Sequence, residues 1–326
     1  MVARAESVRG EPINGKEFDD EAEIDLELEI TDSPTEKVVD DVWDEIFYRQ
    51  STLGDLYPFK IEPRSTGWKL SLRAGGDQQT RIARGCYVAC LLVSALRSRL
   101  LPGEKKTSVF YKKLYKNAPD AFQAVSYLGA PEILGGEAYW FGWPRIKKTT
   151  KYVDALKDLV GLIGHGRLKE KAPDWSTNAE KDGTVDIIAW RSFRDSRYGS
   201  ALLYGQVASG SNWRDKPIGA YIKGYFFDWF EDTPSTKYLP AMFMPFLLHH
   251  DLDPKKGVTF DEAAIAAARR DSSNFGMILD RLRLTELAYH RGRNFESDTE
   301  LRDLGAQVYR WSAQALFYAR SVNIPA

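Results

Sequence analysis

Apolar side chains recur every three or four residues over several long segments of the chain, which is the spacing of helices that bury one face. This spacing predicts helices over residues 38–49, 79–99, 105–116, 119–127, 152–163, 218–230, 261–270, 275–289 and 301–322. We place a break before Pro119, because proline interrupts the hydrogen bonding of a helix. Helices are therefore expected to dominate both ends of the chain.

Short and nearly continuous apolar runs lie between these helices, and they predict buried strands. The runs cover residues 138–143, 184–190, 200–208 and 238–248. A polar turn that contains glycine joins the second run to the third, so we expect these two strands to pair as a hairpin. The chain is thus expected to consist of helices, then a strand-rich centre, then helices.

The composition indicates a folded, water-soluble protein. Of 326 residues, 43% are hydrophobic and 13% aromatic, which is ample for a core. No run of about eighteen apolar residues and no secretory signal is visible, so we expect a cytoplasmic protein with no membrane contact. Two cysteines cannot form a disulfide framework or a structural zinc site. Because Cys86 and Cys90 lie one helical turn apart, we expect buried thiols of a reducing compartment.

The net charge of −1 conceals an uneven distribution of charge along the chain. Residues 1–45 carry 4 basic and 16 acidic side chains, which leaves 41 basic and 30 acidic side chains in the remainder. The acidic segment is expected to be a flexible, solvated tail, or to dock on the basic body in place of a nucleic acid. In the second case, removal of residues 1–36 would strengthen DNA binding at low salt.

Two isolated polar residues in the predicted strands are the candidates for chemistry. Asp186 is the only charged residue of its strand, and Gln206 lies near the end of the next one. In a hairpin both can project from the same end of the sheet, where a carboxylate beside a second oxygen ligand suits Mg²⁺. The alternative is a buried aspartate that accepts hydrogen bonds from backbone amides.

The sequence around these residues resembles a known nuclease core. Residues 181–186 read Lys-Asp-Gly-Thr-Val-Asp, and residues 203–208 read Leu-Tyr-Gly-Gln-Val-Ala, followed by Asn212 and Trp213. This pattern is similar to Mrr-type restriction endonucleases of the PD-(D/E)XK superfamily, in which an Asp strand precedes a strand that ends in Gln-x-Lys. The resemblance implies an α/β fold with a mixed central sheet flanked by helices, built in the order helix, strand, Asp strand, Gln strand, helix, strand.

The resemblance also divides the chain into four parts. Residues 1–37 form the acidic tail, residues 38–104 an N-terminal helical region, residues 105–250 the nuclease-like core, and residues 251–326 a C-terminal helical region. In this core the helix of residues 150–164 is an insertion.

The sequence departs from the family pattern at two positions. The lysine that assists the attacking water is replaced by Ala208, and Lys216 is the expected substitute, with Lys181 a weaker candidate. An acidic residue is missing from the expected place on the first core helix, where Gln123 follows Phe122. The resemblance therefore implies catalysis by Asp186, Gln206 and Lys216, with Mg²⁺ held by Asp186 and Gln206 and additionally by Asp182.

Basic residues in the turn between the two strands are candidates for contact with nucleic acid. Arg191, Arg194 and Arg197 could bind phosphates, although an ordinary solvated turn explains them equally well. The resulting hypothesis is a metal-dependent nuclease that acts on DNA in bacterial restriction or phage defence. The alternative is an inactive subunit with a nuclease fold, which binds nucleic acid or a partner protein of a multi-component defence system.

Overall fold

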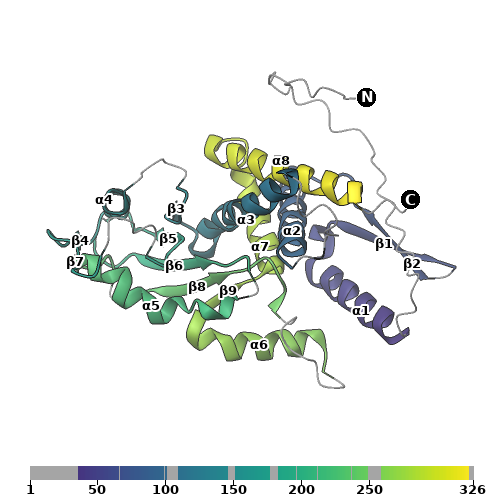
Figure 1. The fold of residues 1–326 in the computed structure, drawn as a ribbon. Coiled ribbons are helices and arrows are strands. Elements are labelled where there is room, and N and C mark those ends of the chain that lie inside the picture. Colours follow the sequence, from purple (N-terminus) through teal and green to yellow (C-terminus); the bar gives the residue numbers. More distant parts are fainter. Residues whose placement is uncertain are drawn as a thin grey trace.

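The computed structural model describes residues 36–65, 67–98, 100, 109–145, 151–176, 183–195, 197–210, 212–235, 237–248 and 258–322. These residues form an α/β structure of eight α-helices, a mixed central sheet of five strands and two small sheets (Figure 1). The expected α/β class is therefore confirmed. Most of the acidic tail, Lys181 and Asp182 lie outside the described residues. No helix in the described ranges is long and apolar enough to cross a membrane.

The central sheet has the strand order β3-β5-β6-β8-β9. β3 pairs with β5, and β5 with β6, in antiparallel fashion, whereas β6–β8 and β8–β9 are parallel pairs. The strands are β3 (Glu137–Trp140), β5 (Ile187–Arg191), β6 (Ala201–Val207), β8 (Leu239–Phe243) and β9 (Met277–Leu279). The first four confirm the four predicted strands, and the hairpin of β5 and β6 forms as expected.

Helices cover both faces of this sheet (Figure 1). They are α1 (Glu36–Leu53), α2 (Gln78–Arg97), α3 (Val109–Leu134), α4 (Tyr152–Ile163), α5 (Ile218–Tyr225), α6 (Phe260–Phe275), α7 (Arg281–Arg291) and α8 (Thr299–Val322). Ile187 and Ala189 of β5 are buried in one core with α2, α3, α7 and α8. Their neighbours Ile188 and Trp190 are buried in a second core with α4 and α5. This alternation is what the period-two geometry of a strand produces when both faces are covered.

The first core helix is continuous, which corrects the predicted break at Pro119. α3 contains both Pro119 and Pro131 in its interior. Proline removes one hydrogen bond from a helix, but Phe122 and Val125 on the same helix are almost completely buried against the sheet. Burial of such side chains stabilises by about 1.5–3 kcal/mol each, so the packing of this helix outweighs the proline penalty.

Two further predicted helices are shorter than expected. Residues 218–230 form α5 and then a 3-10 turn (Phe227–Trp229) that leads into strand β7 (Phe230–Asp232). Residues 275–289 split into β9 and α7. The split occurs where the side chain of Asp280 caps α7. It accepts hydrogen bonds from the backbone N–H groups of Leu282 and Arg283. The C-terminal region thus adds the fifth strand to the central sheet and is not purely helical.

The N-terminal region contains a hairpin that the sequence analysis did not predict. β1 (Phe59–Arg64) pairs with β2 (Gly67–Leu72) in antiparallel fashion. Residues at the start of this unit, including Tyr57, pack with Tyr87 of α2 and Leu282 of α7 in a small separate core. A second small sheet joins β7 to β4 (Arg167–Leu168). Neither small sheet contributes to the central sheet.

Candidate functional site

Asp186 connects the ends of three strands of the central sheet. Its backbone N–H donates to the carbonyl of Gly205 at 2.9 Å, and its Oδ2 accepts the backbone N–H of Val207 at 2.7 Å. Its backbone carbonyl accepts hydrogen bonds of 2.9 and 2.7 Å from the backbone N–H groups of Phe141 and Gly142, which directly follow β3. The amide-bonded aspartate of the alternative interpretation is therefore present.

Gln206 lies between the two β6 residues that Asp186 contacts. Its side chain is buried, with 9% of its surface exposed, and its Oε1 has no hydrogen-bond partner in the described part of the chain. Asp186 and Gln206 therefore lie at the same end of neighbouring strands. A buried carbonyl oxygen without a donor is costly, and an amide oxygen can serve as a ligand of a hard cation.

Gly142 lies where this end of the sheet meets α3. A Cβ atom at residue 142 would come within 2.5 Å of Asp186 Oδ1 and would also collide with Nε2 of Gln123. Gln123 is 6% exposed, and its Nε2 has no hydrogen-bond partner among the described residues. Two buried amide groups with unused hydrogen-bonding capacity thus lie near one carboxylate. We refer to Gln123, Gly142, Asp186 and Gln206 as the Asp186 site.

Gln123 occupies the place on α3 where the resemblance implies an acidic residue, and the acidic residue of α3 nearest to it in sequence is Asp120. Asp120 precedes Gln123 by three residues, so the two lie on the same side of α3. Burial raises the pKa of Asp120, and the nearby positive charge of Lys116 opposes this shift.

Carboxylates are nevertheless few around the site. Among the described residues, no group of three or more His, Cys, Asp or Glu side chains is arranged to hold a metal ion. A divalent cation at the Asp186 site would therefore depend on one carboxylate together with amide and backbone oxygens.

The position of the missing family lysine is closed to solvent. Ala208 is 2% exposed and belongs to an apolar cluster with Trp213 and Met242. Lys216 is exposed and directly follows the 3-10 turn Trp213–Asp215. This turn is fixed to α6, because Arg214 forms an ion pair with Asp271 at 2.8 Å. The proposed role of Lys216 stays a prediction.

The three arginines of the predicted phosphate-binding turn lie at the opposite end of the strands from the Asp186 site. Arg191 ends β5 and donates to the carbonyl of Leu134 at 3.4 Å, whereas Arg194 and Arg197 are exposed in the turn that follows. At roughly 3.3 Å per residue, the five residues of β5 separate the turn from Asp186 by about 16 Å. The open ends and the turn of a hairpin lie at opposite ends of its strands, so these arginines are not part of the site.

Arg97, which the sequence analysis did not select, lies at the same end of β6 as Gln206. It ends α2, and its guanidinium lies over the ring of Tyr115 on α3, 4.9 Å from the centroid. Its Nη2 is 3.4 Å from the position that a Cβ of Gly210 would occupy, in the loop that follows β6. Its Nε is buried and has no hydrogen-bond partner among the described residues. A partly buried cation with an unsatisfied donor is suited to bind an anion.

Comparisons of this chain with models of protein families, with curated proteins and with solved structures gave no match.

Proposed function

We propose that this chain is a metal-dependent nuclease that acts on DNA and has a core of the PD-(D/E)XK type. The order of its elements supports this proposal, because α3, β3, β5, β6, α5 and β8 follow one another as the resemblance implies. The observation that carries the proposal is the Asp186 site itself. The Asp186 carboxylate and the buried, unpartnered amide oxygen of Gln206 belong to residues at the same end of the neighbouring strands β5 and β6.

The donor set of this site fits Mg²⁺. Asp186 Oδ1 and Gln206 Oε1 are hard oxygen ligands, and Gln206 Oε1 is buried without a partner in the described part of the chain. When bound, Mg²⁺ would stabilise negative charge on a phosphate group and lower the pKa of a water molecule. The hydrogen bond from Val207 to Oδ2 fixes the orientation of the Asp186 carboxylate and directs Oδ1 toward Gly142.

Other residues of the chain would position the phosphodiester. The Gln123 amide, which lies next to the same carboxylate, can donate a hydrogen bond to a phosphate oxygen. Arg97 supplies positive charge at this end of β6, and its guanidinium can bind a phosphate through two parallel hydrogen bonds. In this scheme Lys216 replaces the family lysine as the group that assists the attacking water.

A second candidate is a nuclease-fold subunit without activity, which binds nucleic acid or a partner protein. The burial of Ala208 in an apolar cluster favours this candidate, because no amine is available at the usual position. Both candidates agree with a role in bacterial restriction or phage defence.

A cleavage assay distinguishes the two candidates. The full chain would be incubated with end-labelled double- and single-stranded DNA in the presence of Mg²⁺ or of EDTA. An active nuclease should cleave only with Mg²⁺, and Asp186→Asn and Lys216→Ala should each lower the rate about 10²-fold or more while binding persists. Lys223→Ala, which changes an exposed lysine of α5, is the control for Lys216. Binding without cleavage would support the inactive subunit, and the absence of both would refute the nuclease and leave only a subunit that binds a partner protein.

A further inference from the structure

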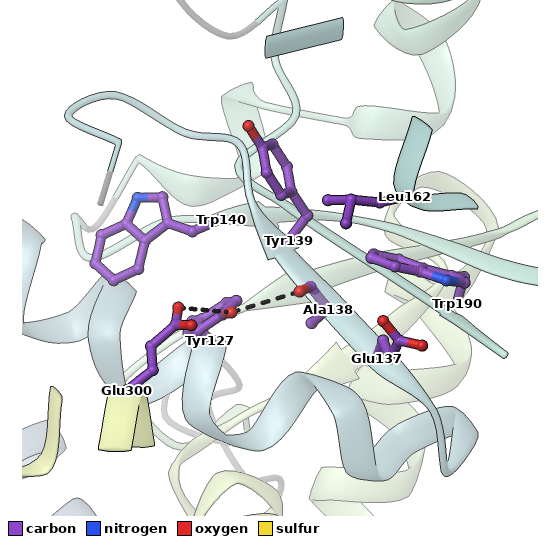
Figure 2. Close-up of a pocket in the computed structure, with 8 residues that line it drawn as sticks. All are labelled: Tyr127, Glu137, Ala138, Tyr139, Trp140, Leu162, Trp190 and Glu300. Carbon is purple, nitrogen blue, oxygen red and sulfur yellow. Dashed lines mark hydrogen bonds between the residues drawn. The ribbon is translucent and has the colours of Figure 1, made fainter. Parts of the chain in front are cut away.

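The central sheet has a pocket beside its free edge strand, and the pocket contains none of the residues of the Asp186 site. β3 is the first strand of the sheet and pairs only with β5 in the described structure. Next to it is a cavity of about 180 Å³, lined by Tyr127, Glu137, Ala138, Tyr139, Trp140, Leu162, Trp190 and Glu300 (Figure 2). Small-molecule sites usually enclose about 300–1,000 Å³. This pocket is smaller, and its size suits one long side chain.

The backbone of β3 offers hydrogen-bonding groups at this edge. The N–H of Phe141 donates to the carbonyl of Asp186, so the backbone groups of residues 137, 139 and 141 point toward β5. The N–H and C=O groups of Ala138 and Trp140 consequently point to the free edge. The Ala138 carbonyl accepts a long hydrogen bond of 3.4 Å from the Tyr127 hydroxyl, which is weak at that distance. An added strand can therefore pair with this edge.

Two carboxylates flank the pocket, and neither forms an ion pair with another described residue. Figure 2 shows Glu137 and Glu300 on either side of Ala138. Glu300 accepts a hydrogen bond of 3.2 Å from the hydroxyl of Tyr127. In contrast, the neighbouring carboxylate of Asp298 forms an ion pair with Arg291 at 2.9 Å. Within the described part of the chain neither carboxylate has an ion-pair partner, and the nearby positive charge of Arg291 is already paired with Asp298.

The remaining walls of the pocket are aromatic. The rings of Tyr127, Trp140 and Trp190 line it, and aromatic faces attract ammonium and guanidinium groups. Burial, and after it the charge of Glu300, raises the pKa of Tyr127, so this phenol stays neutral. The indole Nε1 of Trp190 is buried without a hydrogen-bond partner among the described residues.

We propose that the β3 edge binds an extended, basic segment of a partner protein. The segment adds as a strand to β3 and places an arginine or lysine side chain in the pocket, between Glu137 and Glu300. Strand addition supplies the backbone hydrogen bonds, and the pocket selects the side chain by charge. The edge groups of β3, the two carboxylates and the aromatic walls of the pocket each support this occupant. The inference is independent of the nuclease proposal.

NMR of the full chain labelled with ¹⁵N-tryptophan tests the inference. The probe is the peptide acetyl-Thr-Val-Arg-Val-Thr-amide, and Trp190→Phe assigns the Trp190 indole signal. We expect this signal to shift with a dissociation constant below about 1 mM. A peptide with uncharged citrulline in place of arginine, and the variant Glu300→Gln, should each bind about fivefold more weakly. Glu296→Gln changes an exposed carboxylate that does not line the pocket and should leave the affinity unchanged.

A peptide with an N-methyl group on the valine after arginine tests the strand addition separately. It keeps the charge but loses a backbone donor, so it should bind more weakly than the parent peptide. Equal affinity of the arginine and citrulline peptides, or no shift of the Trp190 signal, would overturn the inference. A shift that depends on protein concentration without any peptide would show that a second copy of the chain occupies the edge, and would also overturn it.

Discussion

The backbone N–H of Val207 donates a hydrogen bond of 2.7 Å to Oδ2 of Asp186. This bond gives the two oxygens of one carboxylate different surroundings. Oδ2 holds the start of β5 to the end of β6, whereas Oδ1 is directed to the space beside Gly142 and Gln123. The structural and chemical roles of Asp186 can therefore be separated by substitution.

Asp186→Asn should fold almost normally, because the asparagine carbonyl can still accept the bond from Val207. Asp186→Ala leaves that N–H without its acceptor, so we expect the free energy of unfolding to fall by about 1–3 kcal/mol. Urea denaturation measures the free energy of unfolding of each variant. If the alanine variant were as stable as the asparagine variant, the bond would contribute nothing to the fold.

Gly142→Ala should disturb the Asp186 site directly. The added methyl group would meet Asp186 Oδ1 and Gln123 Nε2, and overpacking of this kind costs about 1–3 kcal/mol. We expect lower stability together with loss of any Mg²⁺-dependent activity.

Gly161→Ala is the matched control, since Gly161 lies in α4 and an added methyl group there would meet no atom within 4 Å. Alanine favours a helix over glycine by about 0.5–1 kcal/mol, so this variant should be slightly more stable. If both substitutions had the same effect on stability and activity, the crowding around Gly142 would not matter.

Arg97→Gln should weaken the binding of DNA equally for every DNA sequence, because one phosphate contact is lost. The slope of the logarithm of the affinity against the logarithm of the salt concentration should become smaller in magnitude by about one. Arg97→Lys should restore part of the affinity. Arg81→Gln, which removes an exposed charge from the same helix, is the control. Fluorescence anisotropy over a salt series gives both quantities. An unchanged slope for Arg97→Gln would exclude a phosphate contact.

The thiols of Cys86 and Cys90 should be unreactive in the folded protein. Both are free and buried, as the sequence predicted. Burial raises the pKa of Cys86 to about 12 from an ordinary value of 9.0, and it also raises the pKa of Cys90. A thiol reagent at pH 8 should therefore modify them only after unfolding.

The raised thiol pKa values also predict a loss of stability in alkali. Above about pH 9 the unfolded chain releases these protons while the folded chain retains them, so the unfolded state is favoured as the pH rises. Each thiol should lower the free energy of unfolding by about 1–2 kcal/mol at pH 10. Denaturation of a Cys86→Ala, Cys90→Ala double variant should show a weaker pH dependence. An equally steep dependence would assign the effect to other groups.

The fold was most predictable where periodicity extends over a whole element. The helix Tyr152–Ile163 and the strand Ala201–Val207 agree closely with their predicted ranges. The strand Met277–Leu279 has only three residues, which is too short for any periodicity to be recognised, and its neighbours are helical. The helix through Pro119 was missed because its continuity depends on packing against the sheet, which a local pattern does not contain.

The Asp186 site was predictable only in part, for a similar reason. Asp186 and Gln206 stand out as isolated polar residues of adjacent strands, so their proximity follows from the hairpin. Gln123 and Arg97 come from helices that are distant in sequence, and only the tertiary packing brings them to this end of the sheet. The free edge of β3 likewise depends on the strand order, which a single sequence does not specify.

The most direct test of the account is X-ray diffraction from crystals of the full chain soaked in Mn²⁺, with data collected at a wavelength that gives manganese anomalous scattering. The account predicts an anomalous peak about 2.1–2.4 Å from both Asp186 Oδ1 and Gln206 Oε1, and no such peak in Asp186→Asn crystals. A fully folded site without a peak, or a peak that persists in the Asp186→Asn variant, would contradict the assignment of this end of the sheet as a metal-dependent catalytic site.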